Sequence, residues 1–92
     1  MIVSFRHKGL KAFFEADSKK GIQPAHAAKL SRILLLLDSA TGPDDLTIPG
    51  LRLHPLTREL AGHWSVWVNG NWRVTFRFIG SDVELVDYVD YH

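Results

Sequence analysis

The last three residues of the sequence, Asp90-Tyr91-His92, place a carboxylate, a phenol and an imidazole directly after a run that reads as a strand. These groups are suited to proton transfer near neutral pH. His54 offers a second imidazole, and Arg73 offers a planar guanidinium that matches two phosphate oxygens. Together they predict a site that cuts RNA by acid–base catalysis.

Each of these residues also has a structural interpretation that the sequence leaves open. A lone histidine before a proline more often fills a structural position than a catalytic one, and Tyr91 could anchor the last strand. Asp90 could be a turn residue, and Arg73 could belong to a solvated sheet face. Strand alternation also puts Tyr91 on the opposite side from Asp90 and His92, so either the tail leaves the ladder or one of the three faces away from the substrate.

The length and composition predict one small domain spanning residues 1–92. Cysteine is absent, so neither a disulfide framework nor a thiolate metal site is expected. The first eight residues become charged too early for a signal peptide, and the longest aliphatic run, residues 33–37, is too short for a membrane span. We therefore expect a cytoplasmic protein without membrane contact.

The net charge of +1 conceals an uneven distribution along the chain. Residues 1–32 carry seven Lys or Arg and two acidic residues, whereas the stretch from 81 to 92 carries four acidic residues and no Lys or Arg. This asymmetry favours a protein that contacts a polyanion with part of its surface. A solvated charged surface on an ordinary domain explains it equally well.

The first half of the chain has helical periodicity. Leu10, Phe13 and Phe14 recur at helical spacing and predict a short helix that ends near Gly21. Pro24 is well placed in the first turn of a second helix, which residues 41–45 terminate. In that helix Leu35 and Leu36 widen the apolar stripe, which predicts packing on two sides. Residues 2–5 could form a short first strand.

From Leu51 the period changes to two, which predicts strands. Leu51 to His54 reads as a strand that Pro55 ends, because proline cannot donate to a ladder. Residues 64–68 and 72–78 alternate and predict a hairpin. A three-residue loop would pair Val68 with Trp72 and align their apolar sets, with Gly70 or Asn71 left-handed. Residues 80–82 make a second turn into a last strand.

These elements predict an α+β fold with two helices on one face of a mainly antiparallel, twisted sheet. Alternation then gathers a set of polar and aromatic side chains on the uncovered face: Arg52, His54, Trp67, Arg73, Thr75 and Arg77. Cations beside an aromatic ring can bind a phosphate backbone and a stacked base. Arg52, Trp67 and Arg77 are therefore candidate RNA-binding residues. Arg58, which lies just after the His-Pro-Leu segment and outside this set, is a further candidate.

Several short motifs, in order along the whole chain, resemble one family: residues 5–10 (FRHKGL), 53–56 (LHPL), 71–76 (NWRVTF) and 90–92 (DYH). They resemble the HigB branch of the RelE/ParE superfamily of bacterial type II toxins. The resemblance implies His54 and His92 as proton-transfer groups, Asp90 and Tyr91 as their partners, and Arg73 as the phosphate clamp.

The same resemblance implies an mRNA interferase, an endoribonuclease that cleaves translated mRNA in the ribosomal A site. The 2′-hydroxyl of the RNA would attack the adjacent phosphodiester, so neither a metal nor another cofactor is expected. The implied partners are the ribosome, mRNA and a HigA-type helix-turn-helix antitoxin, through which alone the toxin would reach operator DNA. The alternative is a toxin of this fold that binds without cutting, inhibiting DNA gyrase or perturbing ribosomes.

Overall fold

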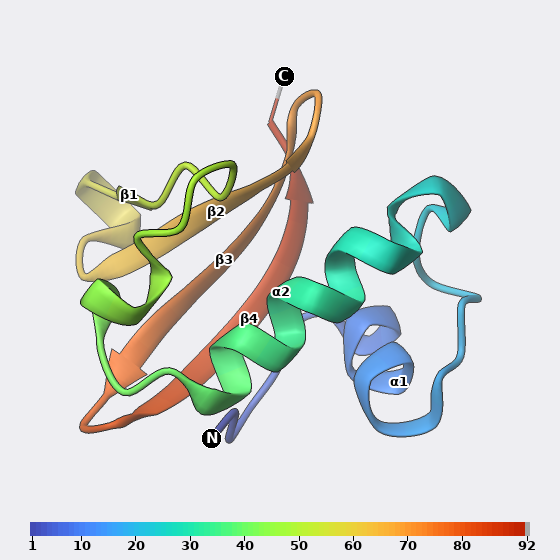
Figure 1. Cartoon of the computed structure of the whole chain (residues 1–92), viewed down its shortest axis with the longest axis horizontal. Coiled ribbons are helices and arrows are strands. Elements are labelled where there is room, and N and C mark those ends of the chain that lie inside the picture. The colour runs from blue at the N-terminus through green and yellow to red at the C-terminus, as the bar shows by residue number, and fades with distance from the viewer. Residues whose placement is uncertain (92) are drawn as a thin grey trace.

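In the computed structural model, which describes residues 1–91, the two α-helices precede a four-stranded sheet (Figure 1). The strands have the order β1-β2-β3-β4, and each is antiparallel to its neighbour. Residues Ile2 and Phe5 form isolated parallel bridges to β4. The elements are α1 (Lys8–Ala16), η1 (Pro24–His26), α2 (Ala27–Ser39), η2 (Pro43–Leu46), β1 (His54–Pro55), η3 (Arg58–Leu60), β2 (His63–Asn69), β3 (Trp72–Ile79) and β4 (Asp82–Asp90).

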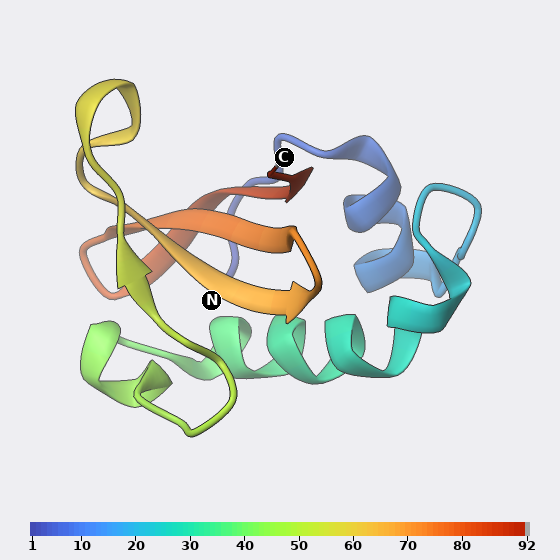
Figure 2. The same ribbon diagram turned by 90° about the horizontal axis from the view of Figure 1, so that it is seen from above.

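The predicted α+β arrangement is confirmed. Figure 2 shows α2 running along one side of the sheet, with α1 beside its first turns. Leu10 of α1, Leu30 and Leu37 of α2, and Val66 and Val74 of the sheet are buried in one core cluster. Burial of these apolar side chains stabilises the contact between helices and sheet. Among the described residues, no helix combines the length and the apolar character needed to cross a bilayer.

The first helix ends earlier than predicted. His7 caps it, since its Nδ1 accepts a hydrogen bond from the N–H of Leu10, and Asp17 ends it in a left-handed conformation (φ 55°). Gly21 has another role: a Cβ built on it would lie 2.5 Å from the Cα of Gly9. The glycine therefore permits the close approach of two backbones rather than ending a helix.

The second helix begins as predicted, but its buried face is narrower than predicted. Pro24 opens the 3-10 turn η1 that leads directly into α2, where its missing N–H has no cost. Leu30 and Leu34 are buried, and Leu36 is half-buried, but Leu35 is 65% exposed. The prediction that Leu35 widens the packed face of this helix is therefore wrong, because the rest of the described chain leaves most of this residue uncovered.

The β2–β3 hairpin has the predicted register as far as Trp67, but the predicted pairing of Val68 with Trp72 is wrong and the turn is different. Val66 pairs with Val74, as the alignment of apolar sets requires. The turn, however, contains only Gly70 and Asn71, because Asn69 pairs with Trp72 and a bulge follows Trp67. The bulge supplies the extra residue that we assigned to the loop. Gly70 is left-handed (φ 54°), as predicted.

The strand predicted from Leu51 to His54 is wrong in extent. Only His54 and Pro55 pair with β2, and Arg52 has a left-handed backbone (φ 51°) that no regular strand accommodates. Leu51 is buried although it lies outside the ladder. The alternation of apolar and polar residues from 51 to 54 therefore arises from the burial of loop residues and not from a strand. Pro55 is tolerated within β1 because this is an edge strand.

A buried polar pair ties β4 to the start of the second helix. The Tyr88 hydroxyl lies 2.6 Å from Nδ1 of His26 and accepts a hydrogen bond from the N–H of Gln23. Trp72 stacks on Tyr88 with ring centroids 4.5 Å apart. Burial, and secondarily the charge of Asp90, raises the pKa of Tyr88, while the bond from Gln23 opposes the rise.

The Tyr88→Phe variant should be less stable at neutral pH by about 1 to 3 kcal/mol, because it leaves a buried imidazole nitrogen without its partner. A raised pKa means that the stability from the neutral phenol is complete below about pH 10 and is lost as pH rises through the folded-state value. Urea unfolding at rising pH should therefore show a steeper alkaline loss in the parent protein than in Tyr88→Phe. Tyr91→Phe, at the exposed tyrosine, serves as the control and should keep the parent's profile.

Candidate active site

A hollow of about 440 Å³ lies where the four strands bring polar side chains together. Its lining comes from residues on or next to each strand: Arg52, His54, Leu56, Ser65, Arg73 and Tyr91. Three of the five predicted catalytic residues, His54, Arg73 and Tyr91, therefore surround one cavity. An imidazole, a guanidinium and a phenol at one hollow can move a proton and bind an anion together.

His54 reaches the hollow from the edge strand. It pairs with Ser65 of β2, which in turn pairs with Thr75 of β3. Ser65 and Thr75 are both buried, and His54 is exposed. The imidazole is therefore exposed at the edge of the hollow beside Ser65, where a substrate can approach it.

Arg73 is held in place by the hairpin turn. Its Nη1 donates to the carbonyl oxygens of Gly70 (2.9 Å) and Trp72 (3.0 Å). The left-handed backbone of Gly70 presents a carbonyl that also accepts from Nε1 of Trp67, at 3.0 Å. These bonds occupy one nitrogen and leave the Nε and Nη2 donors for a phosphate, since guanidinium carries five N–H groups.

Tyr91 leaves the ladder just after β4 and enters the hollow. Its backbone N–H donates to the carbonyl of Asn71 in the β2–β3 turn, and the residue is 41% exposed. Asp90 pairs with Trp72, and its charge acts on Tyr88. Asp90 thus belongs to the opposite side of the strand, as alternation predicted, and does not line the hollow.

The other candidates are distributed more widely than the sequence predicted. Arg77 forms an ion pair with Glu84 on β4, so its charge is partly compensated. Arg58 lies in η3 and is not among the residues that line the hollow. Thr75 is only 4% exposed, which corrects the expectation that it faces solvent. His92 lies outside the described residues.

Two lining residues were missed. Ser65 alternates with the apolar positions of β2, which was sufficient signal to assign it to the same face as His54. Leu56 directly follows the His-Pro pair and lies in the hollow because its N–H donates to the carbonyl of His63, across the edge of the sheet. They provide a hydroxyl and an apolar wall beside the charged groups.

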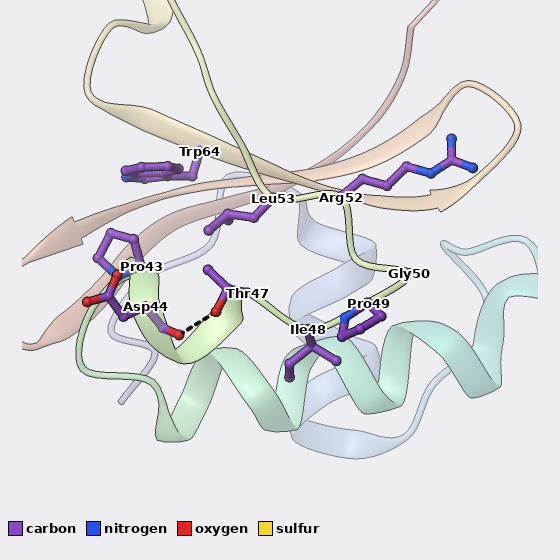
Figure 3. Close-up of a pocket in the computed structure, with 9 residues that line it drawn as sticks. All are labelled: Pro43, Asp44, Thr47, Ile48, Pro49, Gly50, Arg52, Leu53 and Trp64. Carbon is purple, nitrogen blue, oxygen red and sulfur yellow. Dashed lines mark hydrogen bonds between the residues drawn. The ribbon is translucent and has the colours of Figure 1, made fainter.

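A second cavity, of about 560 Å³, lies between η2 and the segment before β1 (Figure 3). Pro43 and Thr47 lie on one side, and Leu53 and Trp64 on the other. Arg52 also belongs to its lining, but its side chain points away from Leu53, toward the β2–β3 turn. The walls are mainly apolar and contain no imidazole among the described residues, so the smaller hollow is the better candidate for catalysis.

Comparison with known proteins identifies the family. Residues 3–92 match the model of the RelE-like toxin of type II toxin–antitoxin system HigB. The chain belongs to the HigB-like toxin family. It is 40% identical to the "Endoribonuclease HigB" of Proteus vulgaris over 92 residues, which is the full length of both chains. It is 35% identical to "Toxin HigB-1" of Vibrio cholerae serotype O1 over 94 residues, covering all of this chain and 98% of that one.

The predicted resemblance is therefore confirmed. Because HigB-like proteins are toxins of type II toxin–antitoxin systems, an antitoxin partner follows from membership. The family match extends over His54, Arg73 and Tyr91, the residues that surround the hollow.

Proposed function

We propose that the protein is the toxin component of its toxin–antitoxin system and acts as an endoribonuclease on translated mRNA. The observation that carries this proposal is the convergence of His54, Arg73 and Tyr91 on one hollow, although they are far apart in sequence. The full-length similarity to a protein named as an endoribonuclease supports the same chemistry.

The reaction needs a base, an acid and a cation. The base takes the proton of the RNA 2′-hydroxyl, whose oxygen forms a bond to the adjacent phosphorus. The bond from phosphorus to the 5′-oxygen breaks, and the acid protonates that oxygen. The products are a 2′,3′-cyclic phosphate and a 5′-hydroxyl, with no metal in the scheme.

We assign the two proton transfers to His54 and His92. Each such transfer accelerates a reaction by about 10² to 10⁴-fold. Arg73 stabilises the extra negative charge on the equatorial oxygens through its Nε and Nη2 donors. Tyr91, at the rim of the hollow, orients the attacking ribose or stacks on a base. Asp90, from the other side of the strand, is assigned as the partner of the terminal proton-transfer group.

RNA reaches this site over a cationic surface. Arg52 lines the hollow itself and is the strongest candidate for binding the RNA backbone. Trp67 and Arg58 are proposed to extend the surface to either side. Arg77 contributes less, because Glu84 already binds its guanidinium.

We further propose the cytoplasmic ribosome as the place of action, with cleavage in the A site. A HigA-type helix-turn-helix antitoxin would neutralise the toxin and carry it to operator DNA. Positive charge from Arg52 and Arg73 at the hollow supports contact with a polyanion.

A reconstituted translation reaction tests this function. Purified toxin is added to ribosomes translating a defined message, and primer extension maps the cuts. Cleavage within the translated region that requires ribosomes is the expected result. A parallel DNA gyrase supercoiling assay should be unaffected; gyrase inhibition without RNA cleavage would replace the nuclease by the binding alternative.

A further inference from the structure

Two cations lie over the ring of Trp67. The guanidinium carbon of Arg52 is 4.1 Å from the ring centroid, and Nζ of Lys29 is 4.6 Å from it. Both distances are within the range of a favourable cation–π interaction. The indole thus binds two cations from distant segments, one from α2 and one from the loop before β1.

Within this cluster, hydrogen bonds to backbone carbonyls hold the side chains of Trp67 and Lys29 in place. Nε1 of Trp67 donates to the carbonyl of Gly70, and Nζ of Lys29 contacts the carbonyl of Gly50 at 3.4 Å. The backbone N–H of Trp67 also donates to the carbonyl of Leu51, which joins the loop to β2. The loop that carries Arg52 is therefore tied to the strand that carries the indole.

The cluster is continuous with the hollow. Arg52 lines the hollow together with Arg73, and Trp67 pairs with Arg73 across the hairpin. The same Gly70 carbonyl accepts from Trp67 and Arg73. A track of positive charge therefore runs from Arg73 through Arg52 to α2.

The charges in this cluster repel one another. The pKa of Lys29 is lowered, first by burial and then by the positive charges of Arg32 and Arg52. Arg32 and Arg52, the two described residues whose charges shift this pKa, are both cationic. Assembling like charges costs stability unless an anion compensates them.

We propose that Lys29 and Arg52, which lie over the ring of Trp67, form with Arg32 a second subsite that binds a backbone phosphate of RNA beside the phosphate cleaved in the hollow. Arg32 follows Lys29 by three residues on α2, so the two side chains are neighbours on the helix surface. This inference rests on the proposed function, because the hollow is taken as the place of cleavage. Lys29 and Arg32 are thereby assigned a role that neither the motifs nor the strand pattern indicated. Trp67 serves to position the cations, rather than chiefly to stack on a base.

The Lys29→Gln/Arg32→Gln double variant tests the subsite. Lys8→Gln/Lys11→Gln, which removes the same charge from exposed positions of α1, is the matched control. Binding is measured against a single-stranded RNA oligonucleotide with 2′-O-methyl groups, which cannot be cleaved, and separately against ribosomes. Urea unfolding verifies that both variants fold, and Trp67→Leu provides a second way to disrupt the cluster.

The Lys29→Gln/Arg32→Gln variant should bind the RNA oligonucleotide roughly tenfold more weakly than the parent protein. The slope of the logarithm of its binding constant against the logarithm of salt concentration should be shallower by about 0.7 for each phosphate contact that is lost. Loss on the free oligonucleotide assigns the phosphate to the message, and loss on ribosomes alone assigns it to ribosomal RNA. Equal behaviour of test and control variants in both measurements would overturn the subsite. Parent protein that binds RNA through these residues but never cleaves it would instead refute the proposed nuclease and leave the subsite standing.

Discussion

Replacing Arg73 by alanine should slow RNA cleavage by about 10² to 10³-fold, the usual effect of removing a preorganised charge donor from a transition state. The guanidinium is oriented by the Gly70 and Trp72 carbonyls and lines the hollow beside His54. Alanine removes both the charge and the fork. Single-turnover cleavage of a programmed ribosome is the measurement, because it separates the chemical step from binding.

Arg77→Ala is the matched control for this experiment. Arg77 lies on the same strand and pairs with Glu84, so its loss should change the rate only slightly and RNA affinity modestly. Arg73→Lys should fall between the parent and Arg73→Ala, since an ammonium keeps the charge without the planar fork. Equal rates for Arg73→Ala and Arg77→Ala would mean that Arg73 is not the phosphate clamp.

The hairpin shows how far the sequence predicts geometry and where it fails. The alternation of apolar residues allows only one useful register, so the pairing of Val66 with Val74 could be predicted. The bulge after Trp67 could not, because adding a residue to a strand or to a turn gives the same register. Its consequence is the position of the Gly70 carbonyl, which orients Arg73.

The loop before β1 was misread for a different reason. Buried Leu51 and half-buried Leu53 alternate with exposed residues just as a strand does, but Arg52 is left-handed. That conformation directs Arg52 over Trp67, whose contact with Lys29 joins segments far apart in sequence. Local periodicity carries no information about such contacts, so the hollow could be predicted in part and the cationic cluster could not.

At the end of β4, by contrast, strand alternation predicted the sides of the last described residues correctly. Alternation alone placed Tyr91 and Asp90 on different sides, and the structure has Tyr91 in the hollow and Asp90 paired with Trp72. The stack of Trp72 on Tyr88 lies beneath this end of β4. The backbone of Tyr91 is already bonded to the carbonyl of Asn71, so this residue has less conformational freedom to lose when RNA binds, which favours a site at this position.

Replacing His54 by glutamine should slow cleavage by about 10² to 10⁴-fold, and His92→Gln should do the same if the two imidazoles share the proton transfers. The pH dependence of the rate distinguishes their roles between about pH 5 and pH 8, where imidazoles usually titrate. Loss of the rise in rate with pH identifies the base, and loss of the fall at higher pH identifies the acid.

Chemical rescue supplies a readout that a structural role would not affect. His54 is exposed at the edge of an open hollow of about 440 Å³, so free imidazole can reach the position that the variant leaves. Added imidazole should restore part of the activity of His54→Gly and none of that of Arg73→Ala. If His54→Gln keeps both limbs of the pH profile and imidazole has no effect on His54→Gly, then proton transfer passes through another group, and Tyr91 becomes the first candidate to test.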